Sequence, residues 1–368
     1  MNNVQKSTLK IPKKKIDDNV IVSNIFRIKK DKDKIELPEK PDNNQSPSQN
    51  KQINNWNIKS FMPRKTNNQL DDLQQLLKQS EKYKQTMQFL ETHPNKRFTD
   101  TMFKADYNSL IGFPQNQRQF GARARGYIWL RPDQFSRRHV YNKVYGEIES
   151  NDIMQGELGD CYFLAAISSI AQVPERLERI FLIKKMVPQG IYVVALCING
   201  IWEDVIIDDK FPCLRQTKGP AFSYSKGGEL WVMILEKAWA KIHGGYYNIN
   251  AGIIREALRD LTGASAKTFF TQDHSPQENW NILSEAFEKK FILTAGSDDL
   301  NNGSDAYISH IGICGAHAYT IMGVYSVARE RGGYRLVHNT QSRSSNVERI
   351  IKLRNPWGKK EWKGDWSD

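Results

Sequence analysis

The sequence lacks the patterns that usually mark secreted and membrane-spanning proteins. It begins Met1-Asn2-Asn3 without an apolar segment, so no secretory signal is predicted. The uncharged run Cys161–Val173 near the middle contains Ser and Gln and is too short to span a bilayer. The 4 cysteines are widely spaced and form no CxxC pair, which argues against a zinc site and against a disulfide-dense scaffold. We therefore expect a reduced, cytoplasmic protein without a transmembrane segment.

Positive charge is concentrated near the N-terminus. Of the net charge of +12, residues 1–100 carry +8, with 20 basic against 12 acidic residues. A nucleic-acid-binding body would carry its positive charge on the folded part, so no nucleic-acid partner is expected. Residues 1–65 are polar and poor in large apolar side chains, which predicts a disordered basic tail. An anionic partner for this tail and a docking site for its short apolar segment 20–26 are left open.

Regular secondary structure is predicted from residue 66 onward. Apolar residues at three- and four-residue steps predict an amphipathic helix over Gln69–Glu91, within a linker of residues 66–97. Further on, the pattern predicts helices within 150–171 and over 229–242, a β-hairpin over 191–207 turning at Asn199-Gly200, and strands over 291–294, 317–324, 334–337 and 350–354. A helical first half and a strand-rich second half predict two subdomains, residues 98–265 and 266–368, with a site in the cleft between them.

Cys161 stands where a glycine-containing segment ends and an apolar helix is predicted to begin. The free N–H groups and the positive dipole end of a helix N-terminus favour a thiolate over a thiol. The same groups can donate to a developing oxyanion, and Gln155, six residues upstream, could supply a second donor. Taken alone, the segment is more typical of a small buried cysteine at the start of a core helix.

A thiolate nucleophile needs a partner base, and imidazole is the usual one. Of the 7 histidines, His317 has the most suggestive setting, since small residues flank it at the start of a predicted strand. Asn355 follows another predicted strand and precedes a proline. Its amide could accept a hydrogen bond from the imidazole while Trp357 shields that bond from water. An Asn-Pro pair by itself is ordinarily only a turn.

Taken together, these segments resemble the calpains, which are papain-like cysteine proteases. The resemblance covers about residues 98–368. It is carried by the segments 152–167, 316–320 and 354–358, and by the supporting blocks 98–100, 109–110, 129–132, 229–231, 235–238, 261–263 and 361–364.

The resemblance implies an α+β, papain-like fold with a helical first lobe, a β-rich second lobe and the active site in the cleft. Cys161 would be the nucleophile, His317 its base and later the acid, and Asn355 the orienting residue. Gln155 would complete the oxyanion hole, and Trp357 and Tyr162 would border the cleft. The implied function is that of an intracellular endopeptidase, which cuts extended segments of protein substrates by limited proteolysis through a thioester and needs no organic cofactor.

Calpains also bind calcium in each catalytic subdomain. The resemblance implies that Asp152 and Glu229 are carboxylates of the first calcium site, since Ca²⁺ prefers hard oxygen ligands. The competing interpretation is that both are ordinary acids near helix starts. Glu147 stands near the position of an expected glycine that would contribute its backbone.

The chain departs from the family pattern in three places. Tyr162 replaces a usual tryptophan, and Ala316 replaces a usual glycine. The sequence ends soon after the asparagine segment, where the family's catalytic domain continues, so subdomain 266–368 is expected to be incomplete. One alternative is therefore a non-catalytic calpain-like scaffold. Another is a transglutaminase-type acyltransferase, although that class normally orients its histidine with an aspartate.

Overall fold

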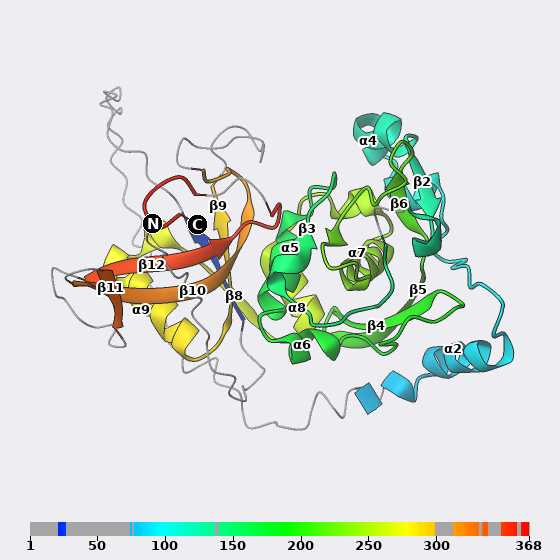
Figure 1. Ribbon diagram of the computed structural model, residues 1–368, viewed down its shortest axis with the longest axis horizontal. Helices are drawn as coiled ribbons and strands as arrows, with labels where there is room; N and C mark the ends of the chain where they lie inside the picture. The colour runs from blue at the N-terminus through cyan, green and yellow to red at the C-terminus, as the bar shows by residue number, and fades with distance from the viewer. Residues whose placement is uncertain are drawn as a thin grey trace, which may run out of the picture.

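The chain forms two lobes that meet along helix α5, Cys161–Ile170 (Figure 1). The computed structural model describes residues 21–26, 74–75, 77–136, 140–298, 312–330, 333–337, 347–358 and 362–367. Helices and strands are mixed, as the α+β prediction requires. Within the part of the chain that the structure describes, every helix is too short or too polar to cross a membrane.

The first lobe is built around α5 and α7, Trp231–Ile242. Nine of the ten residues of α5 and ten of the twelve of α7 are buried, because both sequences are apolar on nearly every side. Four shorter helices lie around them: α3 (Tyr107–Ile111), α4 (Asn116–Ala124), α6 (Pro174–Glu178) and α8 (Ile254–Thr262). Two short strand pairs are also present, β2 (Tyr127–Leu130) with β6 (Phe211–Leu214) and β3 (Ile153–Met154) with β7 (Tyr224–Ser225). Turns of 3₁₀ helix lie at Pro132–Gln134, Ser150–Asp152 and Tyr246–Ile249.

The predicted hairpin of the first lobe is confirmed. Strands β4, Ile191–Ile198, and β5, Ile201–Asp208, pair antiparallel along their whole length. The turn residues Asn199 and Gly200 have φ values of 52° and 83°. Both values lie in the left-handed region that a two-residue type I′ turn requires, which asparagine and glycine adopt most readily.

The second lobe is one twisted sheet with a helix packed against it (Figure 1). The strand order is β11-β10-β9-β1-β8, and β12 pairs with the other edge of β10. The four predicted strands after Gly263 are confirmed as β9 (Ile292–Ser297), β10 (Ala318–Glu330), β11 (Gly333–Val337) and β12 (Val347–Arg354). Strand β8 (Ala266–Phe270) was not predicted. The helix is α9, Pro276–Glu288, which begins with a Ser275–Glu278 capping box, and a 3₁₀ turn at Thr271–Asp273 precedes it.

Strand β1, Ile21–Phe26, corrects part of the predicted tail. The prediction assigned residues 1–65 to disorder, but these six residues run parallel to both β8 and β9 and lie between them. The open backbone edges of two strands supply the partners that local composition could not indicate. The remainder of residues 1–65 lies outside the described residues.

The predicted helix over Gln69–Glu91 is divided in the structure, where residues 74–75 and 77–78 are helical and a turn at Gln79 and Ser80 separates them from the next helix. Helix α2 covers Glu81–Thr92, and Ser80 is its N-cap, since the Ser80 hydroxyl accepts from the Tyr83 N–H at 3.0 Å. The same hydroxyl donates to Asp204 of β5 at 2.6 Å. Ser80 therefore interrupts the apolar periodicity and ties the start of α2 to the hairpin.

Helix α5 contributes several of the hydrogen bonds between the lobes. Its residue Ala165 accepts a hydrogen bond from Thr320 of β10 at 3.0 Å, and Ser169 donates to the Leu293 carbonyl of β9 at 2.9 Å. Just beyond the helix, Gln172 donates to the Ile321 carbonyl at 3.0 Å. The helix that begins with Cys161 is thus hydrogen-bonded directly to β9 and to β10, and β10 begins one residue after His317.

Candidate active site

Cys161 is the first residue of α5, as the sequence predicted. Its side chain is partly exposed, whereas those of Cys197, Cys213 and Cys314 are buried. The first intrahelical bonds run from the Phe163 and Leu164 N–H groups to the Asp160 carbonyl, so the N–H of Cys161 precedes the hydrogen-bonded ladder. This position gives the sulfur the positive end of the helix dipole.

His317 and Asn355 lie side by side, although 38 residues separate them. His317 Nε2 and Asn355 Oδ1 are 2.9 Å apart, and both side chains are buried. Asn355 Oδ1 also accepts from the Trp357 N–H at 3.0 Å, which fixes it as an acceptor. Since an oxygen acceptor needs a donor opposite, Nε2 carries the proton and Nδ1 is the basic nitrogen of the neutral ring.

Two aromatic rings enclose the imidazole of His317. The Trp357 ring lies 4.7 Å away, centroid to centroid, and the Tyr319 ring lies 5.0 Å away in an edge-on arrangement. The backbone of His317 is held by Ser297, whose hydroxyl accepts from the His317 N–H at 3.1 Å. These contacts fix the orientation of the ring, and the shielding role of Trp357 stays a prediction.

Hydrogen bonds bring the Cys161 segment to this group, since the Gln155 N–H donates to the Pro356 carbonyl at 3.1 Å and the Thr320 hydroxyl donates to the Ala165 carbonyl at 3.0 Å. Burial raises the pKa of the Tyr319 hydroxyl, and the charge of Cys161 is among the further causes. The Tyr319 ring itself packs against the imidazole of His317. The structure thus gathers the three predicted segments at one place.

Gln155 connects the nucleophile segment to the asparagine segment. Its backbone N–H donates to the Pro356 carbonyl at 3.1 Å, and its side-chain Nε2 donates to the Leu158 carbonyl at 2.8 Å. An amide nitrogen carries two hydrogens, so Nε2 keeps a second one for another acceptor. The next residue must be glycine, because a Cβ on Gly156 would press on the carbonyl oxygens of Ala221 and Phe222.

Tyr162 differs from its prediction as a residue at the cleft. It is buried, and its hydroxyl accepts from Trp239 Nε1 at 3.1 Å. Residue i+1 of the helix points away from the face that carries Cys161, so Tyr162 packs into the core of the first lobe. Ala316 is held at φ 45°, in the left-handed region where the family's glycine would be unstrained.

A buried carboxyl pair next to Cys161 was missed by sequence reasoning. Asp160 and Glu236 of α7 are both almost fully buried, and Glu236 accepts from the Ser223 N–H at 3.0 Å. Burial raises the pKa of Asp160 well above its usual value, and the Glu236 charge raises it further. Burial also raises the pKa of Glu236, to about 7. A glutamate directly after the apolar run Leu230–Leu235 was the available signal.

The two predicted calcium ligands lie close together beside a lysine. Glu229 is among the charges that raise the pKa of Asp152, after burial, while Lys143 lowers it. Glu229 Oε1 accepts from the Gly146 N–H at 2.7 Å and lies 3.0 Å from the Lys143 ammonium. Among the described residues, no three His, Cys, Asp or Glu side chains are arranged to hold a metal ion. The calcium prediction for Asp152 and Glu229 stays a prediction.

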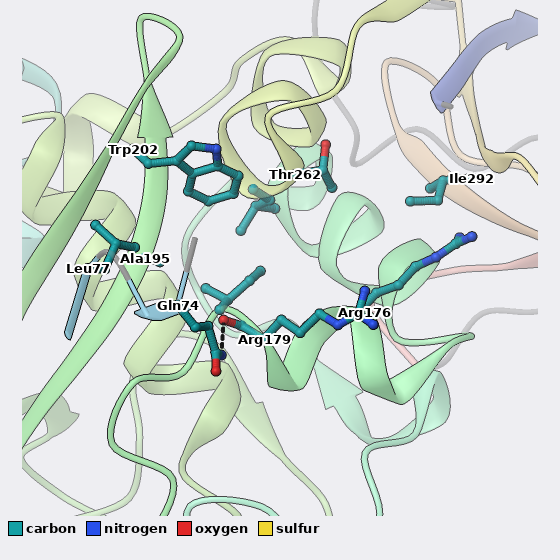
Figure 2. A pocket seen from close by; sticks show the side chains of 10 residues that line it. Gln74, Leu77, Arg176, Arg179, Ala195, Trp202, Thr262 and Ile292 are labelled. Atoms are coloured by element: carbon teal, nitrogen blue, oxygen red, sulfur yellow. Dashed lines mark hydrogen bonds between the residues drawn. The ribbon is translucent and has the colours of Figure 1, made fainter. Parts of the chain in front are cut away.

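A small cavity of about 30 Å³ lies elsewhere, between α6, α8 and the β4–β5 hairpin (Figure 2). Arg179, Trp202 and Ile292 are among its lining residues, and Gln74 donates to the Arg179 carbonyl at 2.6 Å. It has room for a water molecule or two. Cys161 and His317 are not among the described residues that line it, so it is separate from the candidate active site.

Comparison with known proteins identifies the family. Residues 98–368 match the family described as calpain family cysteine protease. The chain belongs to the calpain family. It is 35% identical over 288 residues to the calpain-type cysteine protease ADL1 of Oryza sativa subsp. japonica, and 31% identical over 281 residues to calpain-9 of Homo sapiens. These matches include 74% of this chain in both cases, but they span only 12% of the rice protein and 36% of calpain-9.

Proposed function

We propose that this calpain-family chain is a cysteine endopeptidase with Cys161, His317 and Asn355 as its catalytic triad. The observation that carries the proposal is the 2.9 Å contact between His317 Nε2 and Asn355 Oδ1. It leaves Nδ1 as the basic nitrogen, in the neighbourhood of a partly exposed cysteine at a helix N-terminus.

In the proposed reaction, His317 Nδ1 takes the proton of the Cys161 thiol, and the thiolate attacks the carbonyl carbon of the scissile peptide bond. Nδ1 then gives this proton to the leaving amine as the C–N bond breaks, and a thioester remains. Water attacks the thioester after losing a proton to Nδ1, and the restored thiol receives that proton as the acid product leaves. Asn355 holds the ring and its tautomer throughout.

The developing oxyanion would be stabilised by two donors. One is the backbone N–H of Cys161, which precedes the hydrogen bonds of α5, and the other is the second hydrogen of Gln155 Nε2. The hydrogen bond from the Gln155 N–H to the Pro356 carbonyl supports this role, because it holds Gln155 beside the segment that contains Asn355. Trp357 would cover the triad as a gate.

The papain-like two-lobed fold and the substrate class are part of the same proposal. A partly exposed nucleophile between two lobes suits an extended segment of a protein substrate, which limited proteolysis would cut. Calcium regulation and a cytoplasmic location stay predictions. The transglutaminase-type alternative is disfavoured, because a carboxamide and not a carboxylate lies against His317.

Replacing Cys161 with alanine tests the proposal. The purified chain should cleave casein, and Cys161→Ala should lower the rate by at least about 10³-fold, because nothing else at the site can form the acyl-enzyme. Cys197→Ala, which changes a buried cysteine of β4, is the matched control and should keep the activity. Equal cleavage by Cys161→Ala and the wild type would disprove the assignment.

Labelling separates an enzyme from a non-catalytic scaffold. An epoxide that alkylates activated thiolates should modify Cys161 once per chain, and His317→Ala should slow this labelling strongly because it removes the base. If the folded wild type does not label and does not cleave casein, the scaffold alternative is correct.

A further inference from the structure

The Glu229 carboxylate lies in a pocket made of donors. Its side chain is 3% exposed. Oε1 receives the Gly146 N–H at 2.7 Å and the Lys143 ammonium at 3.0 Å, and Oε2 receives Trp231 Nε1 at 2.9 Å. A buried carboxylate is tolerated only with such partners, and here they include a full positive charge.

The backbone around Glu229 sets the position of Lys143. The segment at Lys143 runs alongside the start of α7, where the Lys143 carbonyl accepts from the Leu230 N–H at 3.1 Å and the Val144 carbonyl accepts from the Trp231 N–H at 2.9 Å. Gly146 leaves the space that the ammonium occupies, because a Cβ on it would lie 2.5 Å from Lys143 Nζ. The lysine is therefore placed by hydrogen-bonded backbone and not only by its own flexible chain.

This arrangement does not fit a resident calcium ion. Calcium requires six to eight oxygen ligands at about 2.3–2.6 Å. Here two N–H groups and an ammonium point at the Glu229 oxygens, and Gly146 presents its N–H to the carboxylate. Such a donor set binds an anion, and a divalent ion at Glu229 would have to displace Lys143 and overcome its repulsion.

We propose that Lys143 is a built-in cation that takes the place of calcium at Glu229. The ammonium neutralises the buried carboxylate and joins segment 143–146 to the start of α7, so this part of the first lobe is assembled without a metal. The inference goes beyond the proteolytic function and would hold even if Cys161 were inactive.

The test measures metal binding and stability in the full chain carrying Cys161→Ala, which prevents self-digestion. Terbium is the probe, because Trp231 lies against Glu229 and would sensitise the luminescence of an ion bound there. The parent should show no saturable signal that depends on Glu229. Lys143→Met should show a saturable terbium signal with an affinity at least about tenfold above any residual binding by the parent, and Glu229→Gln added to it should remove that signal.

Thermal unfolding in EDTA gives a second readout. Lys143→Met should lower Tm by about 3–6 °C, because it leaves Glu229 buried without a counter-charge, and millimolar calcium should restore part of the loss. Lys143→Arg keeps the charge and should behave like the parent. The matched control is Lys289→Met, which removes a lysine whose partner Glu285 is exposed and should change Tm little.

Three results would overturn the inference. The first is a saturable terbium signal in the parent that Glu229→Gln removes, since the ion would then already displace Lys143. The second is a Lys143→Met protein that matches Lys289→Met in Tm and binds no terbium. If Lys143→Met fails to fold, the double variant with Glu229→Gln should fold, because its buried site carries no unpaired charge. Failure of that rescue is the third.

Discussion

Asp160 and Glu236 bring two carboxyl groups together in the interior, next to the nucleophile. Burial raises the pKa of both, that of Glu236 from its usual 4.5 to about 7. The raised value means that the folded protein binds more protons than the unfolded chain between these two pH values. The stability that the protonated pair contributes is therefore fully present below about pH 4.5 and is lost as the pH rises through about 7.

Replacing Glu236 with glutamine should remove this pH dependence. The free energy of unfolding, measured with urea at about pH 5 and about pH 7.5, should fall less in Glu236→Gln than in the wild type, by on the order of 1–3 kcal/mol. Glu91→Gln, at an exposed position on α2, should leave the fall unchanged. If Glu236→Gln retains the wild-type dependence, the pair does not titrate in this range.

At the scale of elements, the second lobe is built around strand β1. Strands β8 and β9 are joined through α9 but do not pair with each other, since β1 lies between them. Neighbouring strands are about 4.8 Å apart, so removing β1 would leave a gap of about two spacings in the middle of the sheet. Both β8 and β9 would then present unpaired edges.

A proline in the middle of β1 tests this dependence. Ser23 pairs with Thr268 on one side and Thr294 on the other, so Ser23→Pro removes a ladder donor from a strand that has neighbours on both sides. We expect a loss of at least about 1–3 kcal/mol in the free energy of unfolding. Ser48→Pro, at a position that the structure does not describe, is the control. Equal stability of the two variants would show that β1 is dispensable.

The features that could be predicted from the sequence are those whose stabilising contacts join residues close together in the chain. The hairpin turn at Asn199-Gly200 and the apolar helix α7 are fixed by neighbouring residues, and both were predicted correctly. Strand β1 depends on partners more than 240 residues away, so composition alone suggested disorder. At the site, the Cys161, His317 and Asn355 segments were recognisable by motif. The partners of Glu229 were not, because the Lys143 contact joins two segments that share no pattern.

At the scale of the whole molecule, α5 couples the two halves of the proposed active site. Thr320 lies three residues after His317, and its hydroxyl donates at 3.0 Å to Ala165, about one turn after Cys161. A shift of one lobe relative to the other would therefore separate the sulfur from the imidazole. Small misplacements of reacting groups are costly to rate even when the fold survives.

The variant Thr320→Val removes this hydrogen bond while nearly preserving the shape of the side chain. The buried Ala165 carbonyl would lose its cross-lobe partner, which should cost about 1 kcal/mol in stability. The value of kcat/KM should fall about tenfold, although the protein stays folded, because the bond sets the distance between the lobes. Thr262→Val is the matched control, since Thr262 donates to the Leu258 carbonyl inside α8 at 2.6 Å and does not link the lobes. Comparable stability loss with unchanged kcat/KM in Thr320→Val would mean that other bonds between the lobes, such as those of Ser169, Gln172 and Gln155, keep the lobes in place without it.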